Sequence, residues 1–232
     1  AALRSRPAPR GLAEPGEIAK QLPALDICDH REVSAEDLIA LAKRCEEVAR
    51  GVKGVTNSEG ASASWGQSHV AIAASNGFAR SYDSSGSSLS VSVLAGDPND
   101  GMETDYDFSS ALHAADLEDP EKIGRTAGEK AVARLNPRKV STRKVPVVFD
   151  WSIAGSIVGH LVSAINGSAI ARKTSFLKDK MGERIFAAGI NIIDDPLRKR
   201  GLRSRAFDGE GLPTTRRAWI ENGVLTGFVL DL

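Results

Sequence analysis

The side chains of this sequence that could do chemistry are four histidines, two cysteines and a late group of carboxylates. The histidines are scattered, and none has a second ligand at metal-binding spacing on one element: His30, His69, His113 and His160. His160 fits an exposed helix edge better than a catalytic base or ligand. The motifs GxSxG and GxxxxGK[ST] are absent. Nucleophile-elbow and P-loop chemistry are therefore not expected from these residues, and no metal site is predicted in this chain.

Four carboxylates form the densest group of candidate acids: Asp194, Asp195, Asp208 and Glu210. Their contexts, DDP and FDGEG, are typical of turns, in which carboxylates accept backbone hydrogen bonds. We favour a turn-stabilising role. A role in shaping a peptide groove or a partner interface is the second interpretation. A hard-cation site is the weakest, because the spacing does not match a calcium loop.

Five basic residues lie between these acidic turns: Arg198, Lys199, Arg200, Arg203 and Arg205. The flanking carboxylates would neutralise much of their field, so a solvated or salt-bridged loop is favoured over partner binding. The chain carries 30 basic and 30 acidic residues, for a formal net charge of zero. Nucleic-acid binding usually requires a basic excess, so direct nucleic-acid contact is not expected.

The two cysteines, Cys28 and Cys45, form neither a CxxC motif nor a disulfide framework. Cys45 shares a helical stripe with Leu38, Leu41 and Val48. We therefore interpret it as a small core residue rather than a reactive thiol.

Helix and strand signals alternate in the first two thirds of the chain. Helices are predicted from Ser34 to about Arg50 and from Asp119-Pro120 to Asn136-Pro137. Strands are predicted at residues 68–75 and 78–82 around Asn76-Gly77, at 88–94 with Leu89, Val91 and Val93 on one face, and at 102–108. These strands should form an antiparallel sheet with the helix at 34–50 on one face.

Residues 145–150, VPVVFD, are predicted as a strand that leads into a helix over about 152–166. One half of this helix is apolar: Ile153, Ala154, Ile157, Val158, Leu161, Val162 and Ile165. The other half is small or polar: Ser152, Gly155, Ser156, Gly159, Ser163 and Asn166. Interior glycines weaken a helix, so we expect another backbone to lie against this small face. A hairpin is predicted at Asn222-Gly223.

The predicted fold is α+β. Residues 1–33 form a connector, residues 34–143 an α+β domain of antiparallel sheet and packed helices, and residues 144–232 the start of a mostly antiparallel β domain entered through a helix. No apolar run approaches 18 residues, so no membrane-spanning helix is expected, and no signal peptide is recognisable. A cytoplasmic location is expected.

Three long phrases resemble the TldD/PmbA family, the "modulator of DNA gyrase" peptidases, and most closely its PmbA/TldE branch. They are GSAIARKTSFLKDKMGERI at 167–185, IIDDPLRKRGLRSRAFDGEG at 192–211 and IENGVLTGFVLDL at 220–232. Family members extend beyond both ends of such a region, so a truncated chain is expected. In the TldD branch the helix carries a zinc-binding HExxxH, whose ligand and base positions correspond here to Val158, Gly159 and Ser163. The resemblance therefore implies a chain without the zinc site.

The resemblance implies a PmbA/TldE-like subunit that pairs with a zinc-bearing TldD-type homologue to degrade small unfolded peptides, or that forms a homodimer. Zinc is expected in the partner and no cofactor in this chain. The candidate groove or interface residues are Gly155, Gly159, Ser163 and the four carboxylates. Two alternatives stay open: a non-proteolytic peptide-binding or regulatory scaffold, and a metallopeptidase with ligands outside these residues.

Overall fold

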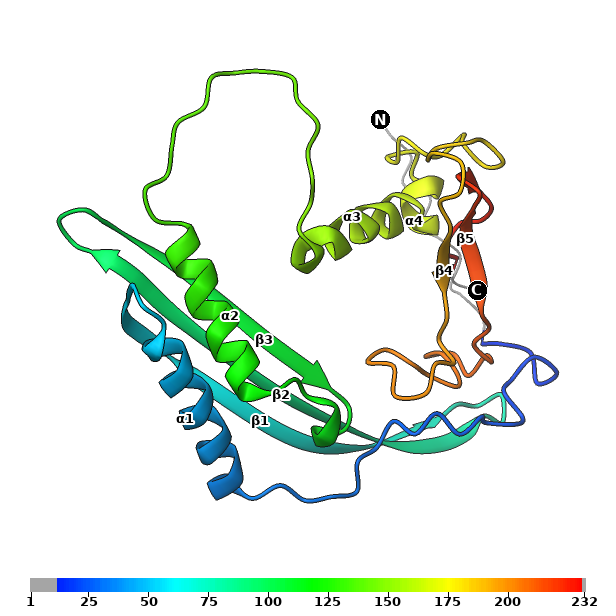
Figure 1. Ribbon diagram of the computed structural model, residues 1–232. Coiled ribbons are helices and arrows are strands. Elements are labelled where there is room, and N and C mark those ends of the chain that lie inside the picture. The colour runs from blue at the N-terminus through cyan, green and yellow to red at the C-terminus, as the bar shows by residue number, and fades with distance from the viewer. Residues whose placement is uncertain (1–11, 231–232) are drawn as a thin grey trace, which may run out of the picture.

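A computed structural model describes residues 12–230, so residues 1–11 of the predicted connector and the last two residues lie outside the described part. A three-stranded antiparallel sheet with two helices on one face is followed by a region with two further helices and a second three-stranded antiparallel sheet (Figure 1). The predicted α+β class is confirmed.

The elements follow one another in this order: α1 (Ala35–Gly51), β1 (Val55–Ala73), β2 (Ala79–Asp97), β3 (Gly101–Ala111), the 3₁₀ helix η1 (Ala114–Asp116), α2 (Pro120–Ala133), α3 (Trp151–Ala164), α4 (Gly167–Ala171), β4 (Ile192–Asp194), β5 (Arg217–Glu221) and β6 (Val224–Leu225).

The first two helices begin where their capping residues predict. The side chain of Ser34 accepts a hydrogen bond from the backbone N–H of Asp37 at the start of α1. At the start of α2, Asp119 accepts from Glu121, and Pro120 occupies the first helical turn. Each cap satisfies a backbone donor that the helix itself leaves unpaired.

The hairpin at Asn76-Gly77 is confirmed, but its strands are much longer than predicted. β1 already begins at Val55, and β2 joins the two segments predicted at 78–82 and 88–94 into one strand. The residues between them are rich in serine and glycine, which have low strand propensity. Pairing with β1, which runs from Ala73 opposite Ala79 to Val55 opposite Ala95 with two register shifts near Val55, overrides that propensity.

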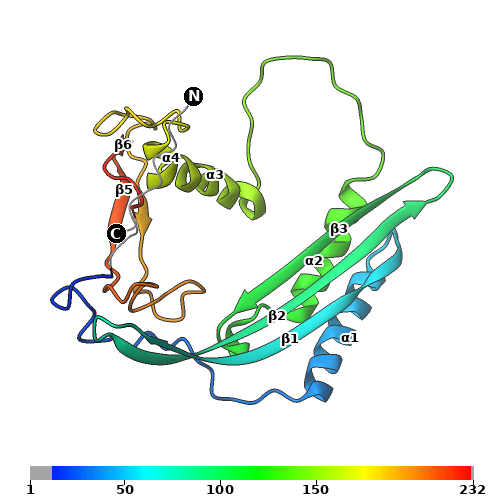
Figure 2. The same ribbon diagram turned by 180° about the vertical axis from the view of Figure 1, so that it is seen from behind.

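The main core lies between the sheet and the helices. Leu89, Val91 and Val93 are buried on one face of β2, as their alternation predicts. They pack against residues of α1 and α2 that include Cys45 and Ile123, both fully buried. Figure 2 shows the opposite face of the sheet without a helix over it.

The predicted strand at 145–150 is wrong. These residues belong to a long arch without regular structure that joins α2 to α3 (Figure 1). Val147 and Val148 are 68% and 94% exposed. A strand needs hydrogen-bonding partners on a neighbouring strand, and among residues 12–230 this segment has none. Its β-branched composition alone therefore does not produce a strand.

The second region has its own smaller core, made by Leu161, Ile165, Leu177, Trp219, Ile220 and Leu225. The predicted turn at Asn222-Gly223 joins β5 to β6, and both residues have positive φ, 48° and 80°. Two successive positive φ values are typical of the type I′ turn that asparagine and glycine favour.

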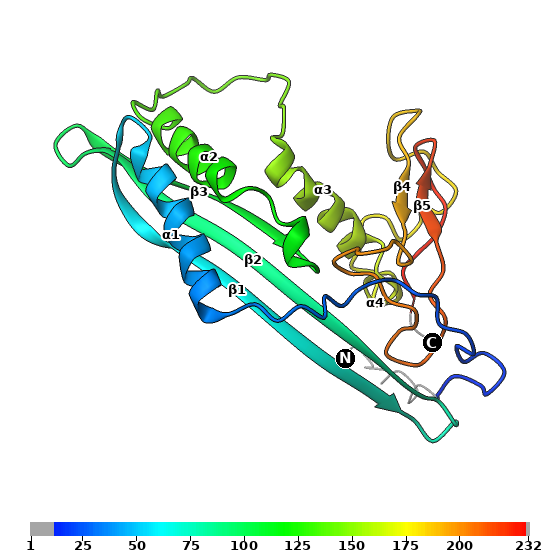
Figure 3. The same ribbon diagram turned by 60° about the horizontal axis from the view of Figure 1, so that its bottom comes forward.

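The two regions meet at the end of the β1–β2 hairpin, and residues 12–33 run along this junction before they enter α1 (Figure 3). Phe78 and Phe207 pack edge to face at a centroid distance of 5.1 Å, beside the buried Ala19. The backbone N–H of Ala19 donates to the carbonyl oxygen of Gly211 at 2.8 Å. Within residues 12–230 no helix is sufficiently long and apolar to cross a bilayer.

Candidate functional site

Helix α3 carries Gly155, Gly159 and Ser163, three of the seven candidate residues, and only its last turn is anchored. Its first turn is capped by Asp150, whose carboxylate accepts from the hydroxyl and the backbone N–H of Ser152; these bonds lower the pKa of Asp150. At the other end Leu161 and Ile165 are buried, and the N–H of Val229 donates to the carbonyl oxygen of Ile165 at 2.9 Å.

The rest of α3 is open to solvent. Ile153, Ile157, Val158 and Val162 are between 38% and 55% exposed. A methyl group added at Gly155 or Gly159 would meet no atom within 4 Å apart from its chain neighbours and the backbone of its own helix. Among the described residues, therefore, no other backbone lies against Gly155 or Gly159, and the approach expected there stays a prediction.

The positions that correspond to the zinc-binding motif, Val158, Gly159 and Ser163, provide few atoms that could bind a metal or accept a proton. Val158 presents a partly exposed isopropyl group, and Gly159 has no side chain. The hydroxyl of Ser163 donates to the carbonyl oxygen of Gly159 at 3.0 Å, so it is engaged within its own helix. His160 is exposed, and within residues 12–230 no three His, Cys, Asp or Glu side chains converge as a metal site requires.

A groove of about 740 Å³ lies beside α3, with His160 and Ser163 on one wall. The segment from Thr174 to Leu177 forms another wall, together with Ile185 and Phe186. Ser175 holds this segment against the helix, because its buried hydroxyl donates to the carbonyl oxygen of Ala164 at 2.5 Å and accepts from Leu177 at 3.0 Å. The groove is mostly apolar and could accept an extended, sequence-variable chain.

None of the four acidic candidates lines this groove. The carboxylate of Asp208 accepts from the N–H groups of Glu210 and Leu212 at 2.9 and 3.0 Å, which fixes the FDGEG turn. Asp195 accepts from Leu197 at 3.3 Å and lies 3.5 Å from Arg216, and Asp194 is the last residue of β4. These contacts fit turn stabilisation; a groove or interface role for the four residues stays a prediction.

Among the five basic residues of the loop, Arg200 forms ion pairs within residues 12–230, and its partners are not the neighbouring carboxylates. Arg200 donates through Nε to Asp26 Oδ2 at 2.6 Å, and its Nη1 lies 3.1 Å from Asp116 Oδ2. Its backbone N–H also donates to the carbonyl oxygen of Leu25 at 2.9 Å. The hydrogen bond from Arg200 lowers the pKa of Asp26, and the bonds to Asp26 and Asp116 raise the pKa of Arg200.

The connector around Asp26 is also attached to the first region. The buried imidazole of His113 lies 3.0 Å from the carbonyl oxygen of Asp26. Asp29 accepts from the N–H of Ala114 at 3.0 Å, and its own N–H donates to the hydroxyl of Ser85 at 2.6 Å. Sequence reasoning missed these contacts, because no local spacing links residues that lie more than 50 positions apart.

Two family models match the chain. The central domain of the PmbA/TldA metallopeptidases matches residues 28–135, and their C-terminal domain matches residues 142–232. Together these matches cover most of the chain, so the chain belongs to the PmbA/TldD family.

The relatives agree with this membership. The chain is 38% identical over 221 residues to "Metalloprotease PmbA" of Escherichia coli O157:H7, which covers 95% of the chain and 49% of the relative. A candidate modulator of DNA gyrase from Bacteroides thetaiotaomicron superposes with a TM-score of 0.89 at 30% identity, over 96% of this chain and 51% of that one. TldE from Thermococcus kodakarensis superposes with a TM-score of 0.72 at 25% identity, over 96% and 50%. The chain thus spans about half the length of these relatives.

The family description names metallopeptidases, and zinc is a common catalytic metal in such enzymes. Catalytic zinc is held by three side chains such as histidine, cysteine or carboxylate. Valine and glycine supply no ligand, and the Ser163 hydroxyl already donates to Gly159. Val158, Gly159 and Ser163 therefore do not fit a zinc site.

Proposed function

We propose that this chain is the PmbA/TldE-like, non-catalytic subunit of a peptidase complex in which a zinc-bearing TldD-type homologue cleaves small unfolded peptides. The observation that supports this proposal most strongly is the composition of α3. The helix is intact and exposed, yet Val158, Gly159 and Ser163 provide neither a set of metal ligands nor a general base. In the complex the partner would supply the metal and its activated water. This chain would supply part of the walls of a chamber that encloses the peptide.

The small face of α3 is the proposed contact surface. Gly155 and Gly159 leave open space at their Cβ positions, so a backbone from the partner or a peptide can approach closely there. The groove beside Ser163 would hold the adjoining part of an extended peptide, where apolar walls and backbone hydrogen bonds tolerate many sequences.

Reconstitution tests the proposal. The full-length protein is mixed with a zinc-bearing TldD-type homologue from the same source, and degradation of an unfolded peptide is followed with and without a chelator. Cleavage that needs both chains and is lost with the chelator is expected. Peptide binding without cleavage under every condition would instead support a regulatory scaffold. Cleavage by this chain alone, with bound metal, would contradict the non-catalytic assignment.

A paired substitution tests the contact surface. Gly159→Leu should weaken pairing or peptide cleavage at least tenfold, because the larger side chain occupies the proposed approach. Leucine favours a helix over glycine by about 1 kcal/mol, so α3 itself should not be lost. Gly51→Leu, at the end of α1 and also facing open space, is the matched control and should change neither measurement. Unchanged assembly and activity in Gly159→Leu would remove this surface from the proposal.

A further inference from the structure

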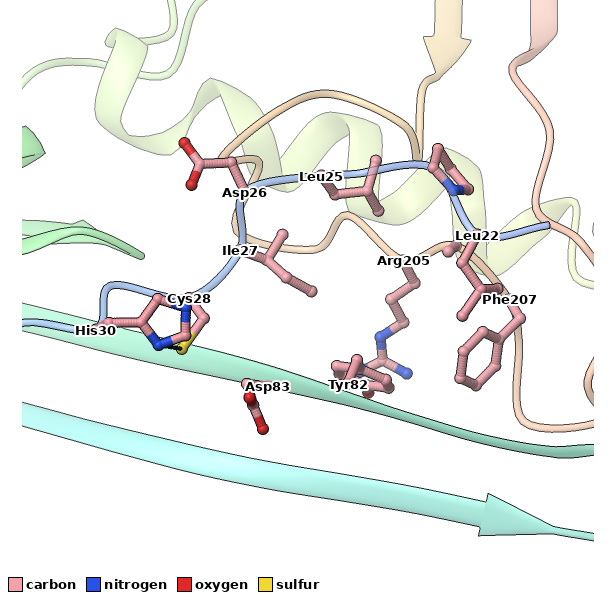
Figure 4. A pocket seen from close by; sticks show the side chains of 12 residues that line it. Leu22, Leu25, Asp26, Ile27, Cys28, His30, Tyr82, Asp83, Arg205 and Phe207 are labelled. Carbon is pink, nitrogen blue, oxygen red and sulfur yellow. Dashed lines mark hydrogen bonds between the residues drawn. The ribbon is translucent and has the colours of Figure 1, made fainter.

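A separate pocket of about 330 Å³ lies where the connector, the start of β2 and the basic loop meet (Figure 4). Its volume is at the small end of the range for small-molecule sites, roughly 300–1,000 Å³. Leu22, Leu25, Ile27, Tyr82 and Phe207 provide most of its apolar wall. The proposed role of α3 does not involve it.

Both carboxylates at this pocket are engaged elsewhere. Asp26 is paired with Arg200, and Asp83 Oδ1 lies 2.5 Å from Nδ1 of His69. Figure 4 shows the two carboxylates directed away from the space between the connector and β2. They therefore do not make the pocket a site for a cation.

Among the described residues that line the pocket, Arg205 is the one arginine or lysine. Its backbone is fixed, because its N–H donates to the carbonyl oxygen of Pro196 at 2.9 Å and its carbonyl oxygen accepts from the hydroxyl of Thr214. Its guanidinium makes no hydrogen bond or ion pair with any residue between 12 and 230, and Figure 4 shows it projecting from the loop toward Tyr82. An apolar wall and an uncommitted guanidinium are thus presented to the same space.

We propose that this pocket binds a compact apolar monocarboxylate: either the C-terminal residue of a peptide or a free organic acid. The carboxylate would accept hydrogen bonds from Arg205, whose planar guanidinium matches a carboxylate. The aliphatic part would lie against Leu22, Ile27 and Phe207. Cys28 and His30, whose Sγ and Nδ1 are 3.8 Å apart, form the adjacent wall.

Calorimetric titration of the full-length protein tests the proposal with three probes. N-acetyl-leucine represents a peptide terminus, 4-methylpentanoate a free acid, and N-acetyl-leucinamide the same shape without charge. At least one acid should bind at least tenfold more tightly than the amide, and added salt should weaken its binding. The acid that binds more tightly identifies the source of the ligand.

The matched variants are Arg205→Met and Arg203→Met. Arg203 is exposed on the same loop but does not line the pocket, so only Arg205→Met should lose acid binding, by about tenfold or more. Alkylation of cysteine in the unmutated protein provides a second, independent test of binding at this pocket. Bound acid should slow alkylation of Cys28 by iodoacetamide, whereas the fully buried Cys45 should stay unlabelled throughout.

Three results would each overturn the proposal. The first is equal binding of both acids and the amide, or no binding of any of them. The second is wild-type affinity in Arg205→Met. The third is alkylation of Cys28 at an unchanged rate when an acid saturates the protein.

Discussion

Arg200 and Asp26 are 174 positions apart in the sequence, yet Arg200 Nε donates to Asp26 Oδ2 at 2.6 Å. The same guanidinium contacts Asp116 in η1, so one side chain joins the connector, the first region and the basic loop of the second region. His113 and Asp29 attach the connector to the first region. Arg200 therefore links the basic loop to the first region in two ways, directly through Asp116 and indirectly through Asp26 of the connector.

Replacing Arg200 with methionine should lower the melting temperature by a few degrees. The substitution keeps much of the aliphatic length but leaves Asp26 and Asp116 without their shared counterion. The effect should shrink at high salt, because exposed ion pairs are screened. Arg203→Met is the control, and differential scanning calorimetry at low and high salt is the measurement. A melting temperature equal to that of the control would show that the ion pairs contribute nothing.

The Asp26 carboxylate should make the free energy of unfolding decrease as the pH falls in the acidic range. Its pKa in the folded protein is lowered by the hydrogen bond from Arg200. Its contribution is therefore fully present above the unfolded-state pKa, about 3.9, and is lost as pH falls through the lower folded-state value. Urea midpoints measured at pH 7, 4 and 3 should fall less steeply for Asp26→Asn than for the wild type.

Asp100→Asn provides the control for that experiment. Asp100 is exposed in the turn between β2 and β3 and forms no ion pair with residues 12–230. The urea midpoints of Asp100→Asn should fall with decreasing pH as steeply as those of the wild type. Parallel curves for Asp26→Asn and the wild type would contradict the assigned role of the Arg200 contact.

Substitution by alanine should have opposite effects on the free energy of unfolding at two helix glycines. A Cβ on Gly124 in α2 would lie 2.3 Å from the carbonyl oxygen of Cys45 in α1, so Gly124→Ala should push the helices apart and destabilise the fold by about 1–3 kcal/mol. Gly155 in α3 faces open space, so Gly155→Ala should be neutral or stabilise the protein by up to about 1 kcal/mol. Denaturant titration measures both free energies, and equal effects would contradict the close contact between α1 and α2.

Local patterns were sufficient to predict several elements of the fold. The caps at Ser34 and Asp119 and the turns at Asn76-Gly77 and Asn222-Gly223 lie where predicted, because capping bonds and positive φ depend on a few adjacent residues. The strand at 145–150 failed for the opposite reason. A strand requires a partner segment, and no property of VPVVFD reports whether one is adjacent.

In the candidate sites too, residue identity could be predicted from the sequence and the contacts between distant residues could not. The side chains at Val158, Gly159 and Ser163 are properties of the sequence alone, and they already limit what chemistry α3 can perform. Only the tertiary structure decided that Arg200 pairs with Asp26 and Asp116, and that Arg205 projects into an apolar pocket. Side-chain donors and acceptors are set by residue type, whereas the choice of partner depends on how distant segments pack.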